Sequence, residues 1–270
     1  GIGDLGDILF MPVIGNVTLK RGVPGKPESG YYSLFSHDEE KAVPGYYSVR
    51  LKRYNIKAEL TATERVGFHQ YTFPVSDSSK MIIDLEMGIG WDGPVDTYIK
   101  QEGDSSIVGY RFSKGWAADQ RVFFTAQFSE PISGFLVYDS ITVKEGTKEG
   151  TGRRIKGVAS FKTKQDQQIK VKVGISPVSI ENARLNINAE IPGWDFNEIV
   201  TKADAAWNKE LNKIKITTSD SSRMRTFYTA LYHTMIAPSI FNDHNGDYRG
   251  TDKKVYEKAT FTNLTTFSLW

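Results

Sequence analysis

The sequence has 270 residues, of which 39% are hydrophobic and 24% charged, and its formal net charge is +2. This composition excludes an intrinsically disordered chain, and the small net charge excludes a nucleic-acid binder that works by phosphate neutralisation. The chain contains no cysteine, so disulfides, thiolate metal sites and a cysteine nucleophile are excluded. The first apolar run, 8–14, is far shorter than the roughly 20 residues that cross a bilayer, so no membrane span is expected.

The region 1–190 is predicted to form a β domain. Segments such as 46–51, 56–60 and, less cleanly, 121–128 alternate polar and apolar residues, as strands with one buried face do. Gly and Pro residues separate these segments at the positions where turns are expected. Repeated strands without intervening helices favour an antiparallel sandwich over parallel βαβ units.

Two helices are predicted after the strands. Apolar residues recur every three or four positions over 194–211, where Asp195 is the expected N-cap. A second helix is predicted over 221–236, just before a proline. The fold class is therefore mainly β. The predicted parts are a large antiparallel β-sandwich at 1–190, a linker helix at 191–215, and the start of a helical domain at 216–270.

Several short motifs have both a chemical and a purely structural interpretation. Residues 1–6 have the glycine spacing of a dinucleotide-binding loop, but a strand follows them instead of a helix, which disfavours cofactor binding. Residues 243–254 begin like a calcium loop but lack its glycine and its bidentate glutamate, so a polar turn is favoured. The spacing of the histidines does not match a zinc site.

Carboxylates and tryptophans offer the remaining candidates for sugar chemistry. Asp92 and Asp96 flank a Gly-Pro turn and form one candidate pair of catalytic acids, although a solvated turn is the favoured interpretation. Trp91, Trp116 and Trp194 could stack on sugar rings, although core packing is the favoured use of each.

A set of strings that occur in order along the chain carries a resemblance to a known family. The strings are GDLGDI at 3–8, FSHDEE at 35–40, PGYY at 44–47, ELTATERVGFH at 59–69, FSKGW at 112–116, GIS at 174–176, SIENA at 179–183, YTALYH at 228–233, YRGTD at 248–252 and FSLW at 267–270. Together they resemble glycoside hydrolase family 92, a family of bacterial exo-acting α-mannosidases.

This resemblance implies a β-sandwich, a helical linker and an (α/α)6 barrel, with 216–270 as the truncated start of the barrel. It also implies inverting, calcium-dependent hydrolysis of terminal mannose from glycans, in a periplasmic or secreted enzyme. The family's general acid, general base and calcium ligands would lie downstream of Trp270, so this chain alone would hold no catalytic or metal residue and would be inactive. His37, Asp252 and Trp270 are the expected substrate contacts, with a role at the domain interface as the alternative.

Two alternatives to a mannosidase are compatible with the sequence, and neither requires catalytic residues in this chain. Aromatic residues make up 12% of the chain, which also suits a non-catalytic carbohydrate-binding β-sandwich module with the two helices as a tail. A third possibility is an assembly domain whose apolar tail, from Ala259 onward, associates with a partner. Glycan binding by the sandwich alone would favour the module over the enzyme.

Overall fold

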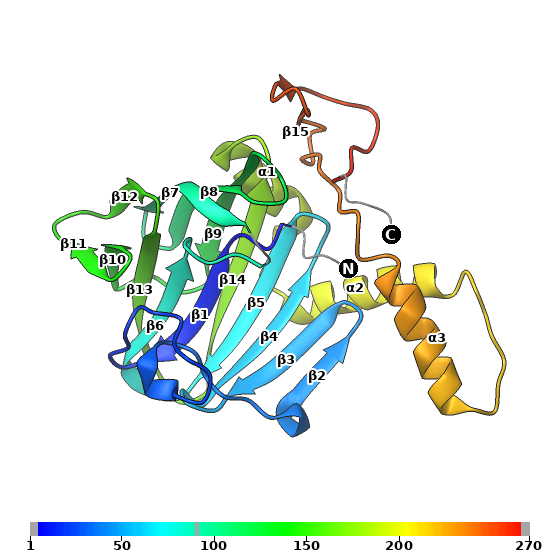
Figure 1. Ribbon diagram of the computed structural model, residues 1–270. Coiled ribbons are helices and arrows are strands. Elements are labelled where there is room, and N and C mark those ends of the chain that lie inside the picture. Colours follow the sequence, from blue (N-terminus) through cyan, green and yellow to red (C-terminus); the bar gives the residue numbers. More distant parts are fainter. Residues whose placement is uncertain (1–4, 90–91, 266–270) are drawn as a thin grey trace.

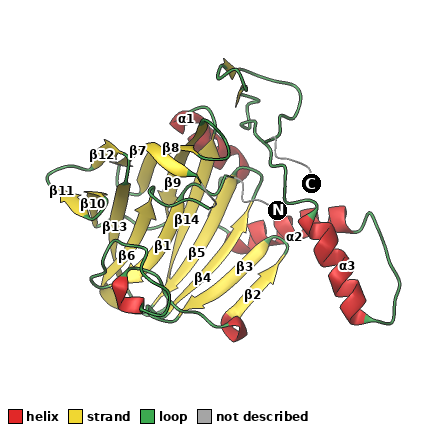
Figure 2. Ribbon diagram, in the orientation of Figure 1, coloured by secondary structure: helices red, strands yellow, loops and turns green. Residues whose placement is uncertain are grey.

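The computed structural model describes residues 5–89 and 92–265 of the chain. Two antiparallel sheets pack face to face, and the three α-helices of the described residues follow them in sequence (Figures 1 and 2). The predicted β-sandwich followed by helices is therefore confirmed. Each of these helices falls short of the length and apolar character that a membrane span requires.

The larger sheet has nine strands, in the order β12-β7-β8-β9-β14-β5-β4-β3-β2. The smaller sheet has five strands, in the order β1-β6-β13-β10-β11. The strands of the larger sheet are β2 (Glu40–Val43), β3 (Tyr46–Leu51), β4 (Ile56–Ala62), β5 (Val66–Phe73), β7 (Gly93–Glu102), β8 (Ser106–Lys114), β9 (Gln120–Phe128), β12 (Glu149–Gly152) and β14 (Gln167–Ser176). The strands of the smaller sheet are β1 (Leu9–Ile14), β6 (Ser76–Asp84), β10 (Gly134–Asp139), β11 (Thr142–Lys144) and β13 (Ile155–Thr163).

The main core lies between the two sheets. Ile83, Phe124 and Val137 are fully buried in this core. The other residues of their strands either alternate between buried and exposed or are covered on the outer face by a second layer of the chain. A smaller cluster, which includes Phe68 and Phe196, lies on the outer face of the larger sheet, where two helices cover it. Because part of the larger sheet is buried on both faces, β9 shows the weak alternation noted in its sequence.

The helices are α1 (Ile180–Glu190), α2 (Phe196–Leu211) and α3 (Ser221–His233). The side chain of Asp195 accepts a hydrogen bond from the backbone of Glu198, so the predicted N-cap of α2 is confirmed. The second helix was predicted over 221–236, whereas α3 begins at Ser221 and ends at His233, so it is shorter than predicted. Helix α1 lies within the range predicted as the β domain. Its buried face includes Asn186, so its apolar periodicity is too weak to identify it.

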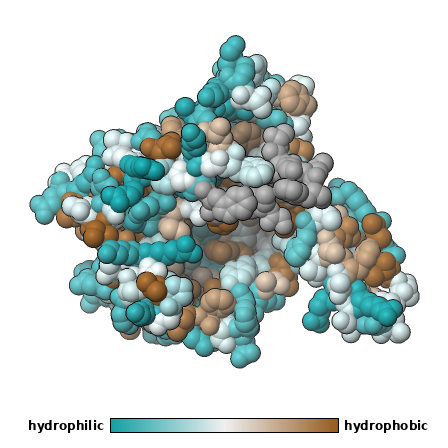
Figure 3. Space-filling view, viewed as in Figure 1, coloured by the Kyte–Doolittle hydropathy of each residue, from teal (hydrophilic) through white to brown (hydrophobic). Residues whose placement is uncertain are grey.

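Helix α3 has little contact with the sandwich. None of its residues is buried, and it meets α2 through Tyr232, whose ring centroid lies 4.7 Å from that of Trp207. Apolar side chains gather on this helix in the space-filling view (Figure 3). The short strands β15 (Tyr248–Arg249) and β16 (Val255–Tyr256) form a separate hairpin, and the 3-10 helices are η1 (Pro27–Ser29) and η2 (His37–Glu39).

A buried ion-pair network ties the chain just before β1 to the larger sheet. Arg111 is fully buried, and its Nη1 contacts carboxylate oxygens of Asp7 and Asp92 at 2.5 Å each. Its Nε donates to the carbonyl of Leu85 at 3.0 Å. Burial raises the pKa of Asp7, and the Arg111 guanidinium works against that shift. The network therefore depends on both charges being present.

Replacing Arg111 with methionine is expected to lower the free energy of unfolding by about 3–5 kcal/mol, because the Asp7 carboxylate stays buried without its partner. Urea denaturation measures the change. Arg50→Met is the control: Arg50 lies at the surface, with 44% of its side chain exposed, and its loss should change the free energy by no more than about 0.5 kcal/mol. Equal changes in the free energy of unfolding for the two substitutions would contradict a stabilising role of the Arg111 network.

Candidate functional site

His37, one of the expected substrate contacts, lies on the surface beside the edge strand β2. Its Nδ1 is 2.6 Å from Oε2 of Glu40, and Glu40 also accepts a hydrogen bond from the Tyr47 hydroxyl at 2.7 Å. The imidazole meets the ring of Phe35 edge-on, with centroids 5.5 Å apart. The His37 side chain is 87% exposed. The carboxylate orients the ring, and Nε2 remains accessible to an external hydroxyl group.

Asp252 lies in the turn of the β15–β16 hairpin. Its carboxylate accepts hydrogen bonds from the backbone N–H of Lys254 at 3.1 Å and from the Tyr256 hydroxyl at 2.8 Å. The bond from Tyr256, followed by the bond from Lys254, lowers the pKa of Asp252. The carboxylate is therefore ionised at neutral pH and can accept further hydrogen bonds.

The structure does not bring these two residues together. His37 precedes β2 at the bottom of Figure 1, whereas Asp252 follows β15 at the top. Trp270, the third expected contact, lies outside the described residues, as does most of the glycine motif at 1–6. The assignment of these three residues to substrate stays a prediction.

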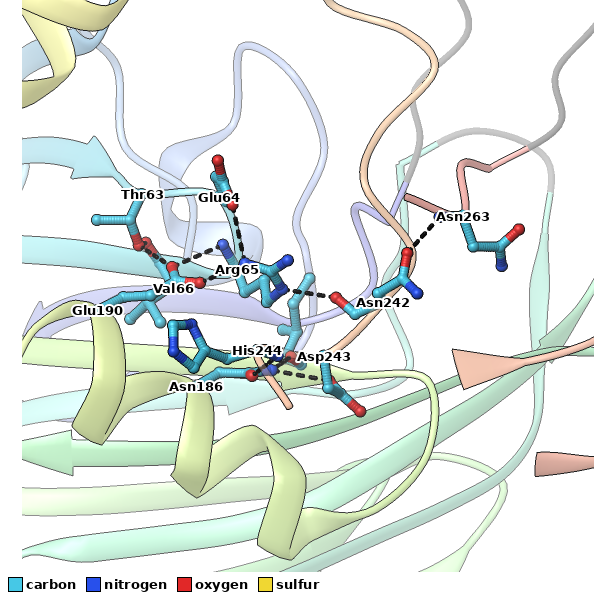
Figure 4. A network of polar contacts seen from close by, with 11 residues as sticks. Thr63, Glu64, Arg65, Val66, Asn186, Glu190, Asn242, Asp243, His244 and Asn263 are labelled. Carbon is cyan, nitrogen blue, oxygen red and sulfur yellow. Dashed lines mark hydrogen bonds and ion pairs between the residues drawn. The ribbon is translucent and has the colours of Figure 1, made fainter. Parts of the chain in front are cut away.

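The most extensive polar network lies where the segment 239–265 meets the sandwich (Figure 4). The carboxylate of Asp243 is buried and accepts hydrogen bonds from Ser176 Oγ at 2.7 Å, Asn182 Nδ2 at 2.9 Å and Asn186 Nδ2 at 2.8 Å. Burial raises the pKa of Asp243, and these three neutral donors work against that shift. The carboxylate thus joins the segment to β14 and to α1.

Arg65 makes a second attachment for the same segment. Its Nη1 lies 2.7 Å from Oε1 of Glu190, and its Nε donates to the carbonyl of Asn242 at 2.6 Å. The side-chain oxygen of Asn242 accepts the backbone N–H of Asn263. The stretches around Asn242 and Asn263 are therefore tied, directly or through one residue, to Arg65, which immediately precedes β5, and through Arg65 to Glu190 of α1.

A cavity of about 230 Å³ lies beside this junction. Arg65, Arg121 and Ser176 line one side of it, and residues 239–243 line the other. Ligand pockets usually have volumes of about 300–1,000 Å³. The cavity is therefore too small for an oligosaccharide and is best described as part of the junction.

The turn that begins like a calcium loop is built as a polar turn. Asp247 Oδ2 accepts hydrogen bonds from the side-chain amides of Asn182 at 3.1 Å and Asn245 at 2.7 Å. The oxygens of Asp243 likewise face N–H and O–H donors. Within the described ranges, no group of three or more His, Asp or Glu side chains comes together in a way that could hold a metal ion. The described residues therefore do not fit a calcium ion.

Asp92 and Asp96 serve different networks. Asp92 contacts the buried Arg111, whereas Asp96 accepts a hydrogen bond from the Tyr110 hydroxyl at 3.0 Å. Each carboxylate thus has a local structural partner, and the structure provides no argument for a pair of catalytic acids here.

The tryptophans fall into two environments. Trp194 packs against Phe68 and covers Nζ of Lys172, which lies 4.1 Å from the ring centroid. This is the core-packing use favoured from the sequence. Trp116 differs, because 54% of it is exposed in the turn between β8 and β9. Trp91 lies outside the described residues.

His69 is a strand residue, as its sequence context suggested. Its Nδ1 is 3.0 Å from the Tyr71 hydroxyl, and its ring meets Phe10 edge-on at 5.5 Å. Burial lowers the pKa of His69 to about 4. The imidazole is therefore neutral at pH 7 and belongs to the packing of the sandwich.

Residues 1–176 match the glycosyl hydrolase family 92 N-terminal domain, and residues 182–270 match the glycosyl hydrolase family 92 catalytic domain. The chain belongs to glycosyl hydrolase family 92. The first match ends with β14 and the second begins within α1, so most of α1 and all of α2 and α3 fall in the catalytic-domain match.

Among solved structures, a family GH92 alpha-mannosidase from Bacteroides thetaiotaomicron is 38% identical, with a TM-score of 0.92 over 98% of this chain and 36% of its own. Another GH92 family glycosyl hydrolase is 26% identical, with a TM-score of 0.84 over 97% of this chain and 36% of its own. A curated relative, the "Uncharacterized secreted glycosidase" of Arthroderma benhamiae, is 26% identical over 85% of this chain and 32% of its own length. The chain thus spans about a third of these relatives.

The buried His69 predicts a pH dependence of stability. Its folded-state pKa of about 4 lies below the ordinary value of 6.5, so the unfolded chain binds more protons between these values. Stability should therefore fall as the pH drops through this window, by on the order of 1–3 kcal/mol for this residue. Comparing urea denaturation of the wild type and His69→Gln at pH 7 and pH 5 tests this. If His69→Gln lost as much stability between pH 7 and pH 5 as the wild type, the buried His69 would not be the source of the pH dependence.

Replacing Asp243 with alanine should loosen the segment 239–265. The donors of Ser176, Asn182 and Asn186 would lose their acceptor, and each buried polar group left unpaired costs about 1–3 kcal/mol. Hydrogen exchange should become faster across the segment while the core strands stay protected. Asp77→Ala, at an exposed position of β6, is the control. Identical exchange in both variants would show that Asp243 does not hold the segment.

Proposed function

We propose that the protein containing this chain is an exo-acting α-mannosidase, which releases terminal α-linked mannose from glycans by an inverting, calcium-assisted mechanism. One observation carries the proposal: the similarity to the Bacteroides α-mannosidase, at 38% identity over 98% of this chain. The β-sandwich followed by helices, together with matches to both domains of family 92, supports it.

The proposed reaction divides its tasks between parts of the protein. An inverting glycosidase uses one carboxylic acid to protonate the leaving oxygen and a carboxylate to activate water on the opposite face of the sugar. The candidate pair Asp92 and Asp96 does not suit this role, since the two carboxylates are held by separate partners. We therefore place the acid and the base in the two thirds of the relatives' length that this chain does not span.

Calcium assistance rests on the family resemblance alone. The described residues do not fit the ion, because the carboxylates of Asp243 and Asp247 are already bonded to amide and hydroxyl donors. The ligands are therefore proposed to lie outside this chain as well, and no step of the reaction is assigned to calcium here.

The contribution of this chain is to position the helical part and to contact the glycan. Helix α2 is attached to the sandwich through Phe196, and the segment 239–265 is attached through Asp243. His37 and Asp252 both present polar groups at the surface, which suits contacts to sugar hydroxyls. Together with Trp270 they are the proposed substrate contacts. The secreted fungal relative supports a secreted or periplasmic location.

Assay of the full-length protein on an α-mannoside tests the proposal. Mannose should be released in calcium and not in EDTA, and NMR should detect the β-anomer first, because inversion converts the α-linkage. An α-glucoside serves as the control substrate, and circular dichroism verifies folding. A folded protein that releases no mannose would contradict the activity. A first-formed α-anomer would contradict inversion, and full activity in EDTA would contradict the role of calcium. Glycan binding without hydrolysis would favour the carbohydrate-binding module.

A further inference from the structure

Asn245 and Gly246 form the only Asn-Gly pair in the sequence. In such a pair the backbone nitrogen of the glycine can attack the side-chain amide carbon of the asparagine, because glycine has no Cβ to hinder the approach. A succinimide ring forms and ammonia leaves, and water then opens the ring to aspartate or isoaspartate. The pair lies in the turn that Asp243 anchors, and Asn245 is exposed to the water that this reaction needs.

The folded turn restrains both groups that the reaction must join. The side-chain amide of Asn245 donates to Oδ2 of Asp247 at 2.7 Å, and its oxygen accepts the backbone N–H of Asp247 at 3.1 Å. The attacking nitrogen, that of Gly246, donates to the carbonyl of Asp243 at 2.9 Å. Ring closure takes the proton from this nitrogen and removes the amide NH2 group, so it breaks two of these bonds. The turn must therefore open before Asn245 can react.

The fold also requires the residue that makes Asn245 reactive. Gly246 has a φ of +89°, which favours glycine, and an added Cβ would lie 2.7 Å from the carbonyl oxygen of Ala259. The carbonyl of Gly246 accepts the backbone N–H of Ala259 at 3.1 Å. A larger residue at 246 would thus disturb the turn and its attachment to the chain after β16.

Deamidation changes the charge at the point where Asp247 is held. Oδ2 of Asp247 also accepts a hydrogen bond from Asn182 at 3.1 Å, and Oδ1 accepts the backbone N–H of Lys258 at 3.0 Å. Burial acts to raise the pKa of Asp247, but these bonds and the bond from Asn245 outweigh it and lower the pKa. A carboxylate at 245 would replace a donor with a like charge at hydrogen-bond distance, which is unfavourable. Isoaspartate would in addition lengthen the backbone of the turn by a methylene group.

We propose that Asn245 is a site of spontaneous deamidation, that the reaction proceeds through opening of the turn at 242–247, and that its product keeps the turn open. The reaction consumes water, releases ammonia and needs no enzyme, oxidant or metal. The hydrogen bonds of Asp243 set its rate, since a firmly held segment opens rarely. Neither the reaction nor its consequence involves the proposed mannosidase activity.

Mass spectrometry of the full-length protein, incubated at neutral pH and then digested, measures the conversion, and labelling by an isoaspartyl methyltransferase detects isoaspartate. Residue 245 should be converted, whereas Asn55, which is exposed but precedes Ile56, should stay intact. Asp243→Ala should raise the rate at 245 about tenfold, equivalent to an opening that costs about 1.4 kcal/mol less. Asp77→Ala is the control and should leave the rate unchanged. Urea below the unfolding transition should raise the wild-type rate, which tests the opening without a substitution.

Hydrogen exchange tests the consequence of the reaction. Asn245→Asp, which has the product side chain, should speed exchange across 239–265, whereas Asn245→Gln keeps an amide donor and should stay closer to the wild type. The site would be overturned if neither the wild type nor Asp243→Ala were converted while a synthetic 242–248 peptide was fully deamidated. Equal rates in the wild type with and without urea, and in Asp243→Ala, would overturn the opening route. Wild-type exchange in Asn245→Asp would overturn the effect on the turn.

Discussion

A buried carboxylate that is surrounded by neutral donors holds the segment 239–265 to the sandwich and to α1. Asp243 is 1% exposed, and it is bonded to Ser176, Asn182 and Asn186. Amide and hydroxyl donors can compensate a buried carboxylate if all of its lone pairs are used, whereas an incomplete set is costly. This requirement fixes the turn at 242–247 in one geometry. That geometry sets the position of the β15–β16 hairpin, which follows the turn.

Further contacts hold the segment 239–265 at other points along its length. The Arg65 guanidinium joins Asn242 to Glu190, so α1 and β5 hold the same turn from a second side. Farther along, Arg249 pairs with Asp119 and sets the hairpin on the 115–119 loop. The loop is itself tied to the Arg111 network through its glycine. Two buried networks, far apart in sequence, thus help to determine how the β15–β16 hairpin lies against the loop between β8 and β9.

Local patterns were sufficient for strands such as β3, β4 and β9 and for two of the three helices, but the Gly-Pro pair predicted as a turn beside Asp92 lies inside β7 (Gly93–Glu102), so that turn prediction was wrong. Asp195 was predicted as the N-cap of α2 because capping depends on neighbours only three residues away. The Asp243 network could not be predicted in this way, since its donors lie 57 to 67 residues earlier in the chain. Arg111 and Asp7 are 104 residues apart. Helix α1 was missed because its buried Asn186 serves that network rather than an apolar face.

The two described candidate tryptophans show why residue type alone cannot identify a sugar-binding site. Trp194 follows a Pro-Gly pair and lies over Lys172, where the sheet and the start of α2 enclose it. Trp116 follows Ser-Lys-Gly at a strand end, and nothing in that local sequence distinguishes its use. Trp194 packs against the cluster around Phe68 and Phe196, which the helices cover on the outer face of the larger sheet, whereas Trp116 lies in the turn between β8 and β9 with 54% of its surface exposed. The same residue type thus belongs to a packed layer in one place and is half-exposed in another, because residues distant in sequence set its surroundings.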